Sequence, residues 1–316
     1  MMDFPVSVLE LLSTDTAHPA VDAHGFVDVA QAADRAGYHR IWYTEHHGEL
    51  SFIAFPPAVV IARVASVTTS IRVGSGGVLA VNHAPLSLAE QFEALTSFFP
   101  GRIDLGIGRG PGAPEEVARA LRRRRDPATE EEYHASVAEI LRLTANHQYA
   151  AQPWLLASSP AGAALAARLG LPMAFAHHLR PQNATAAVDR YRTEFRPSPW
   201  NDAPRLMLAV HAIGADSDAE AEVLAGPANV IRARLATNQP SIGVLGIDDA
   251  AKYEFSAEER QVVAAFRKHS AQGTPEVVRT RLVELAGRFG ADEIMIHSPI
   301  IDPGMRVHSY ELIMGG

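Results

Sequence analysis

Short apolar runs alternate with amphipathic segments along almost the whole chain, and this alternation limits the fold more than any other feature. Helical spacing of apolar residues, prolines at helix starts and glycines at helix ends separate the runs. The expected strands are residues 6–12, 41–44, 71–79, 103–108, 154–157, 173–176, 206–213 and 293–297. Eight strands that alternate with helices are typical of an α/β TIM (β/α)8 barrel, because a doubly wound open sheet uses fewer strands.

The segments between these strands read as helices, with one exception. The expected helices are residues 22–36, 57–67, 86–98, 131–145, 162–169, 181–195 and 276–289. Residues 227–255 have weak periodicity, and we interpret them as an insertion between strands seven and eight. The sequence contains no internal repeat or low-complexity linker, so we expect residues 1–316 to form a single domain.

Composition narrows the function classes. The 316 residues are 47% hydrophobic and 20% charged, as in ordinary globular proteins. A net charge of -8 gives no basic footprint for nucleic acid or an anionic membrane, so we expect a small-molecule partner. The absence of cysteine excludes disulfides, thiolate catalysis and cysteine-bound metals. The sequence shows no signal peptide and no membrane-spanning apolar run, which predicts a cytoplasmic protein.

Polar residues follow the predicted strands, where the active-site mouth of such a barrel forms. They are Glu45, His46, His47, Asn82, His83, Arg109, Ser158, Ser159, His177 and His178. The histidines leave a metal site open, although no carboxylate accompanies the later ones. Neighbouring side chains on extended backbone point to opposite sides, so only one of His46 and His47 can face the mouth.

The segment from Ser158 to Gly162 lies between a strand and a helix start, where free N–H groups and the helix dipole favour an anion. Arg109, one strand earlier, supplies a guanidinium that matches phosphate oxygens. Together they predict a phosphate site. The alternative for the two serines alone is a helix cap.

Glycines cluster in two places. Those near Arg109 do not match the dinucleotide fingerprint, because Pro111 breaks the spacing. Gly76 and Gly77 are unusual within a strand, and they indicate the close approach of something flat, such as an isoalloxazine ring, a special backbone conformation or a bulge.

Four separate motifs then resemble one family in order and spacing. The segments "YTEHHG", "GGVLAVNHAPLSLAEQFEALTSFFPGRIDLGIGRGPG", "PWLLASSPAGAALAARLGLPMAFAHH" and "GADEIMIHSPIIDPGMRVHSYELI" resemble the bacterial luciferase-like flavin monooxygenases, in their single-chain branch. The resemblance implies a TIM-barrel enzyme that takes reduced FMN (FMNH2) from a separate flavin reductase and uses O2.

The resemblance also implies roles for individual residues. His46 matches an acid–base group over the flavin, and Glu45 matches a structural or flavin-proximal acid. Gly76 and Gly77 match a small pair with a cis peptide beneath the isoalloxazine. The matches to the FMN phosphate site are Arg109 and Ser159.

Other positions are less certain matches to the family. Ser158 and Gly162 replace the glutamate and threonine of the light-emitting luciferase subunit, which argues against light emission but not against flavin binding. Asn82, His83 and His177 are candidates for positioning the flavin or the substrate.

Three alternatives stay open: a deazaflavin (F420)-dependent oxidoreductase that uses no O2, a non-catalytic FMN-binding protein, and a metal hydrolase. The sequence indicates only an amphipathic, medium-sized organic substrate. Family members are often dimers, and the apolar helices within residues 58–67 and 88–99 are candidates for a homodimer interface.

Overall fold

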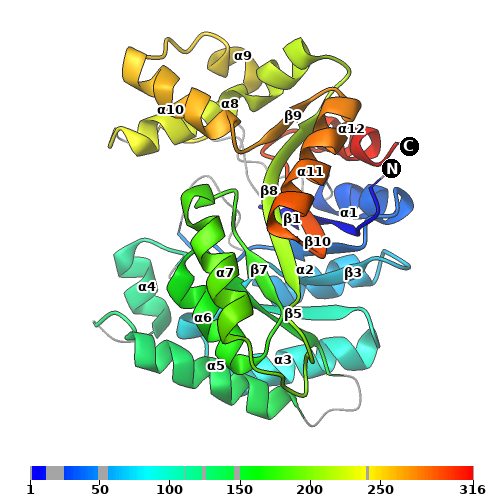
Figure 1. The fold of residues 1–316 in the computed structure, drawn as a ribbon, viewed down its shortest axis with the longest axis vertical. Coiled ribbons are helices and arrows are strands. Elements are labelled where there is room, and N and C mark those ends of the chain that lie inside the picture. The colour runs from blue at the N-terminus through cyan, green and yellow to red at the C-terminus, as the bar shows by residue number, and fades with distance from the viewer. Residues whose placement is uncertain are drawn as a thin grey trace.

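A ring of parallel strands forms the centre of the fold in this computed structural model (Figure 1). The structure describes residues 2–11, 25–48, 56–110, 112–122, 126–145, 150–239 and 242–315. In ring order the strands are β1 (Val6–Glu10), β2 (Arg40–Tyr43), β3 (Arg72–Ser75), β5 (Ile103–Gly108), β6 (Gln152–Ala157), β7 (Met173–Phe175), β8 (Leu206–Gly214) and β10 (Glu293–His297). Because β10 pairs with both β1 and β8, the ring closes, and the predicted TIM barrel is confirmed.

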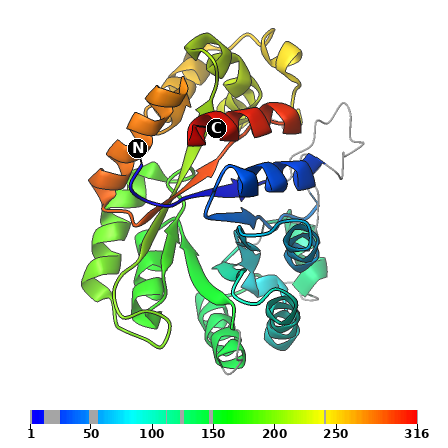
Figure 2. The same cartoon turned by 90° about the vertical axis from the view of Figure 1, so that its right-hand side faces the viewer.

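Helices surround the ring on its outer side (Figure 2). They are α1 (Gly25–Arg35), α2 (Pro57–Ala65), α3 (Pro85–Phe98), α4 (Glu115–Arg122), α5 (Glu130–Thr144), α6 (Pro160–Leu169), α7 (Ala184–Glu194), α11 (Pro275–Phe289) and α12 (Pro303–Met314), with the 3-10 turns η1 (Ala80–Asn82) and η2 (Pro181–Asn183). Local sequence determines where several of these helices begin or end. Thr129 and Glu132 form a capping box on α5, and Gly170 ends α6 with a φ of 62°.

The predicted third strand differs from the observed one. Residues 71–79 form two pieces, β3 and β4 (Val78–Leu79), because the peptide bond between Gly76 and Gly77 is cis and breaks the ladder. The short helix α4 was not expected from the sequence. Residue 12 of the predicted first strand and residues 22–24 of the predicted first helix lie outside the described residues.

The predicted insertion between strands seven and eight is present. Its predicted bounds, residues 227–255, were wrong, and the segment is largely helical despite its weak periodicity. It comprises α8 (Asp218–Ala236), α9 (Ile247–Ala250), α10 (Ala257–Arg267) and β9 (Ala271–Gly273), which pairs with β8 outside the ring. Pro227 lies inside α8 rather than at its end, and it is buried. A proline removes one helix hydrogen bond, which burial of its ring offsets. In Figure 1 these helices lie together beyond one end of the barrel.

A buried ionic cluster closes the opposite, N-terminal end of the ring. Arg40 opens β2, Glu293 opens β10 and Asp104 lies at the start of β5. The Arg40 guanidinium donates to Asp104 at 2.7 Å and to Glu293 at 2.6 and 3.0 Å, and its side chain is 2% exposed. The cluster therefore ties three strands together beneath Trp42, whose indole N–H donates to Asp104 at 3.0 Å.

Candidate active site

A cavity of about 1430 Å³ opens at the C-terminal ends of the strands. Its wall includes Leu9 from β1, Trp42 from β2, Ala209 from β8 and Met295 from β10. The insertion contributes side chains from α8 and α10. Cavities that hold one small ligand are about 300–1,000 Å³, so this volume accommodates a cofactor together with a substrate.

His46 lines the cavity and His47 does not. The His46 Nδ1 atom lies 3.1 Å from the Thr44 hydroxyl, which fixes the ring orientation. Burial, together with the neighbouring His47, lowers the pKa of His46 below its ordinary value of 6.5. The imidazole at the cavity wall is therefore neutral at pH 7 and able to accept a proton.

Glu45 also lines the cavity, and its side chain is buried. Its carboxylate accepts hydrogen bonds from His47 at 2.7 Å, from His83 at 2.9 Å and from the Leu79 N–H at 2.9 Å. Burial by itself would raise the pKa of Glu45, but these bonds, with His83 first among them, hold it below its usual value. Glu45 thus remains a carboxylate that anchors His83 and β4. Of the two roles that the resemblance implies, a structural acid or a flavin-proximal acid, this arrangement favours the structural acid.

Gly76 and Gly77 both line the cavity, and their missing side chains point into the protein. A Cβ atom on Gly76 would lie 2.4 Å from Leu9, and one on Gly77 would lie 2.6 Å from the Gly106 carbonyl oxygen. The cis peptide between them matches the special backbone conformation expected here. The backbone of the neighbouring strand therefore requires a glycine at position 77, whatever ligand lies above it, whereas at Gly76 the added atom would meet the end of the Leu9 side chain.

We expect Gly77→Ala to lower the free energy of unfolding by about 1–3 kcal/mol, because the added methyl group meets backbone atoms that cannot rotate away. Urea unfolding followed by circular dichroism measures the change. The matched control is Gly287→Ala in α11, where a Cβ meets nothing within 4 Å. That change should be neutral or stabilising by up to about 1 kcal/mol. Equal effects of the two substitutions would contradict the packing argument.

The predicted phosphate residues come together at one side of the cavity. Arg109 follows β5, and Ser158 and Ser159 follow the adjacent β6. The Ser159 hydroxyl accepts from the Gly162 N–H at 3.2 Å and so caps α6. Arg109 is exposed and forms no ion pair with a described residue. A guanidinium beside a helix N-terminus fits a phosphate group, although the cap interpretation of Ser159 also holds.

The three predicted positioning residues do not line the cavity, and one of them, His83, bonds to the Glu45 carboxylate instead. His177 is buried against Phe289 and His269, with ring centroids 5.6 and 5.8 Å away, because the turn after β7 directs its neighbour His178 into the cavity instead. Asn82 ends η1 outside the cavity lining. Neither side chain therefore lies in the cavity wall beside the other predicted site residues.

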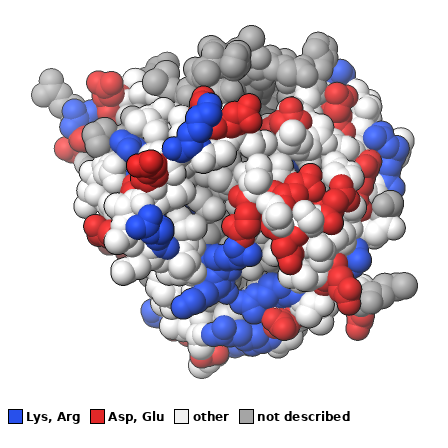
Figure 3. Space-filling model, turned by 90° about the horizontal axis from the view of Figure 1, so that it is seen from above, with Lys and Arg blue, Asp and Glu red and all other residues white. Residues whose placement is uncertain are grey.

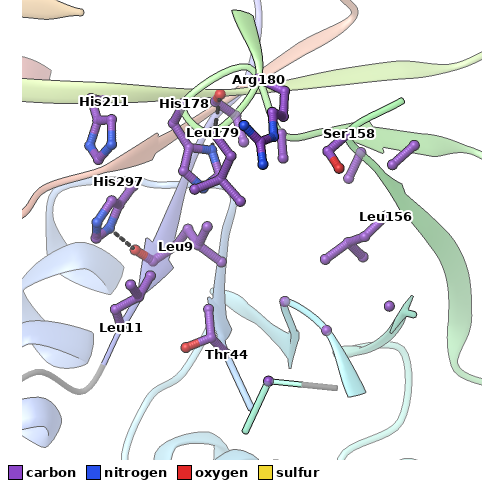
Figure 4. A pocket seen from close by; sticks show the side chains of 18 of the residues that line it. Leu9, Leu11, Thr44, Leu156, Ser158, His178, Leu179, Arg180, His211 and His297 are labelled. Atoms are coloured by element: carbon purple, nitrogen blue, oxygen red, sulfur yellow. Dashed lines mark hydrogen bonds between the residues drawn. The ribbon is translucent and has the colours of Figure 1, made fainter. Parts of the chain in front are cut away.

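Sequence reasoning missed a histidine cluster on the wall formed by β7, β8 and β10. The centroids of the His178, His211 and His297 rings lie 4.9–5.8 Å apart. Figure 4 shows the three residues on one side of the cavity. His297 ends its strand, so the strand-end rule could have found it. Arg232 of α8 joins them and donates to the His211 Nε2 atom at 2.9 Å, and no sequence signal pointed to it.

Each imidazole of the cluster is held neutral. Burial lowers the pKa of His178 to about 4 and of His297 to about 3, and it lowers that of His211 well below 6.5. No group of three or more ligating side chains suits a metal ion within the described ranges. The Arg232 guanidinium at His211 also disfavours a second cation there.

These lowered pKa values predict acid sensitivity. An unfolded histidine takes up a proton below about pH 6.5, whereas the buried ones resist it. Stability is therefore full above pH 6.5 and falls as the pH drops toward 4. Thermal melting across this range measures the slope. We expect His297→Asn to flatten the slope, and the same change at the exposed His308 to leave it unaltered. Melting that does not change from pH 7 to pH 5 would contradict the prediction.

The outer surface carries separate groups of acidic and basic side chains on the face shown in Figure 3. None of the helices in the described ranges is long and apolar enough to cross a membrane.

A barrel whose cavity opens at the C-terminal ends of its strands, lined by Arg109, the start of α6 and His46, has the layout of TIM-barrel enzymes. Residues 2–293 match the profile of the luciferase-like monooxygenases. A luciferase-like monooxygenase of Escherichia coli strain K12 is 35% identical over 98% of this chain and 95% of its own. The chain belongs to this family of flavin-dependent monooxygenases, and the resemblance is confirmed.

Solved structures show the same fold. The crystal structure of apo-MsnO8 has a TM-score of 0.87 and 32% identity, covering 99% of this chain and 98% of that one. Two more distant structures share the fold at 16% and 13% identity, with TM-scores of 0.73 and 0.69. One is the oxygenating constituent of a 3,6-diketocamphane monooxygenase from Pseudomonas putida in complex with FMN, covering 98% of this chain and 96% of that one. The other is an F420-dependent secondary alcohol dehydrogenase, covering 99% and 98%.

Proposed function

We propose that this protein is an FMNH2-dependent monooxygenase that uses O2 to oxidise a small organic molecule. The observation that carries the proposal is one cavity that combines a phosphate cradle at Arg109 and α6 with a neutral imidazole at His46. The family is one of flavin-dependent monooxygenases, and a structure with the same fold holds FMN.

Each residue has a part in this function. Arg109, Ser158, Ser159 and the Gly162 turn would hold the phosphate, and Gly76 and Gly77 would lie beneath the ring system. Bound reduced flavin supplies the electrons that activate O2. His46 accepts or returns a proton at its Nε2 atom, since Nδ1 faces Thr44. The helices of the insertion exclude water from the cavity.

Stopped-flow spectroscopy tests the proposal. The protein is mixed with FMNH2 under argon and then with oxygenated buffer, and both flavin reoxidation and O2 consumption are followed. We expect binding of FMNH2, and reoxidation at a rate that differs from that of free FMNH2. Absence of flavin binding would overturn the proposal, and binding without product from any substrate would favour a non-catalytic flavin protein.

An F420-dependent oxidoreductase is the second candidate, since one structure with the same fold is an F420-dependent dehydrogenase. The same cavity would then hold a deazaflavin and transfer hydride without O2. Comparing FMN and F420 in binding titrations, and testing F420 reduction under argon, separates the two functions.

We also propose that a flavin reductase supplies FMNH2 and that the protein forms a homodimer through α2 and α3. Val59, Leu86 and Phe98 on these helices are large apolar side chains with more than half of their surface exposed. We expect the double variant Val59→Glu, Phe98→Glu to sediment as a monomer, with the circular dichroism of the parent. A parent protein that already sediments as a monomer would contradict the homodimer.

A further inference from the structure

A half-buried cation without a counter-charge among the described residues lies in the cavity wall. Arg232 lines the cavity, and among the described residues no carboxylate pairs with it. Its guanidinium lies 3.1 Å from the centroid of the Phe266 ring and donates one hydrogen bond, to His211. Burial lowers the pKa of Arg232 to about 10, so the group stays charged at pH 7. A partly buried charge without a partner costs folding free energy, and a bound anionic ligand would offset that cost.

This cation lies away from the phosphate cradle. Arg109 follows β5, and β5 lies opposite β10 in the ring, four strands away in either direction. The strand next to β10 is β8. Arg232 contacts His211 of β8, beside His297 of β10. Three arginines line the cavity, of which Arg109 and Arg180 are exposed and Arg232 is half-buried. A phosphate bound at Arg109 therefore leaves Arg232 for a second anion.

The surrounding imidazoles are neutral and offer hydrogen-bond acceptors rather than positive charge. His178 and His297 each direct Nδ1 to a backbone carbonyl, of Ala209 at 3.3 Å and of Leu9 at 3.2 Å, as the dashed lines in Figure 4 show. A neutral ring that donates through Nδ1 keeps a lone pair on Nε2. Such lone pairs would repel an anion, so the anion is directed to the guanidinium and a donor group to the imidazoles.

The lip of the cavity beside Arg232 is apolar. Leu179 is 62% exposed, Leu235 is 75% exposed, and Ile231 lies one residue before Arg232 on α8. All three line the cavity. Exposed apolar side chains around an opening are suited to an apolar body.

We propose that the substrate is an amphipathic organic carboxylate, whose anionic group pairs with Arg232 while its apolar body lies against the lip of Leu179, Ile231 and Leu235. This inference rests on the proposed function, because it takes the flavin phosphate to be bound at Arg109 and so assigns the second anion site to the substrate. His211 positions the guanidinium, and Phe266 supports its face.

Isothermal titration calorimetry of the flavin-free, full-length chain tests this. The probes are the straight-chain carboxylates from butanoate to decanoate and the primary amides of the same lengths, which have the same body without the charge. We expect at least one carboxylate to bind about tenfold or more tightly than its amide. Arg232→Gln should abolish that preference, and Arg232→Lys should retain part of it. A series with no carboxylate preference overturns the proposal.

Two controls separate this site from the flavin. Arg180→Gln removes an exposed arginine of the same cavity and should leave the carboxylate preference intact. Arg109→Gln should weaken binding of oxidised FMN and not of the carboxylate, and Arg232→Gln should do the reverse. If Arg232→Gln weakens FMN and leaves the carboxylate unaffected, the guanidinium serves the cofactor and the proposal fails. A protein that prefers carboxylates but consumes no O2 with FMNH2 would refute the proposed function alone.

Discussion

His46→Ala is expected to lower kcat/KM for FMNH2-dependent turnover by about two to four orders of magnitude, the usual contribution of a positioned acid–base group. The ring lies at the cavity wall and is oriented by Thr44, so its removal takes away the proton acceptor without opening the phosphate cradle. The affinity for FMN, measured by titration, should therefore stay unchanged. Turnover that survives the substitution would remove His46 from the mechanism.

The pH profile gives an independent measure of the same group. The pKa of His46 lies below 6.5, so the ring is unprotonated at pH 7 and becomes protonated only as the pH falls through that lowered value. We expect turnover to fall on the acid side with a midpoint below pH 6.5, and this limb to vanish in His46→Ala. The matched control is His134→Ala, a histidine that also lines the cavity, which should keep the limb.

Arg40→Met is expected to lower the free energy of unfolding by about 3–5 kcal/mol, because two buried carboxylates lose the one cation that they share and keep only the partly exposed Arg72 and Arg205. Asp104 and Glu293 have fully buried side chains, and both accept from Arg40. Urea unfolding measures the loss. Arg190→Met is the control, since that arginine pairs with Glu194 on the surface, and it should cost under about 1 kcal/mol.

The same cluster predicts a response to acid. Burial would raise the pKa of Asp104, but Arg40 and Arg72 hold it below its usual value of 3.8. Its ion pairs therefore stabilise the fold above about pH 4 and are lost as the pH falls further. A loss of less than about 1 kcal/mol for Arg40→Met at pH 7 would contradict the whole account.

Much of the candidate site follows from local sequence. Strand ends identify Arg109, Ser158 and Ser159 because a residue that follows a barrel strand lies at its mouth whatever the rest of the chain does. Alternation limits the choice between His46 and His47 to one of them, and the structure places His46 at the cavity. The same reasoning failed for His177, since the turn after β7, and not strand alternation, directs His178 inward.

The sequence by itself determined the barrel, because hydrophobic periodicity and helix boundaries are local properties that the closed ring only brings together. It also determined that glycines stand at positions 76 and 77. Only the tertiary structure decided that the backbone of Gly106 requires a glycine at position 77, that Glu45 faces His83, and that Arg232 reaches His211 from a helix of the insertion. Those contacts join residues distant in the chain, and their geometry depends on how the ring closes and where the insertion packs.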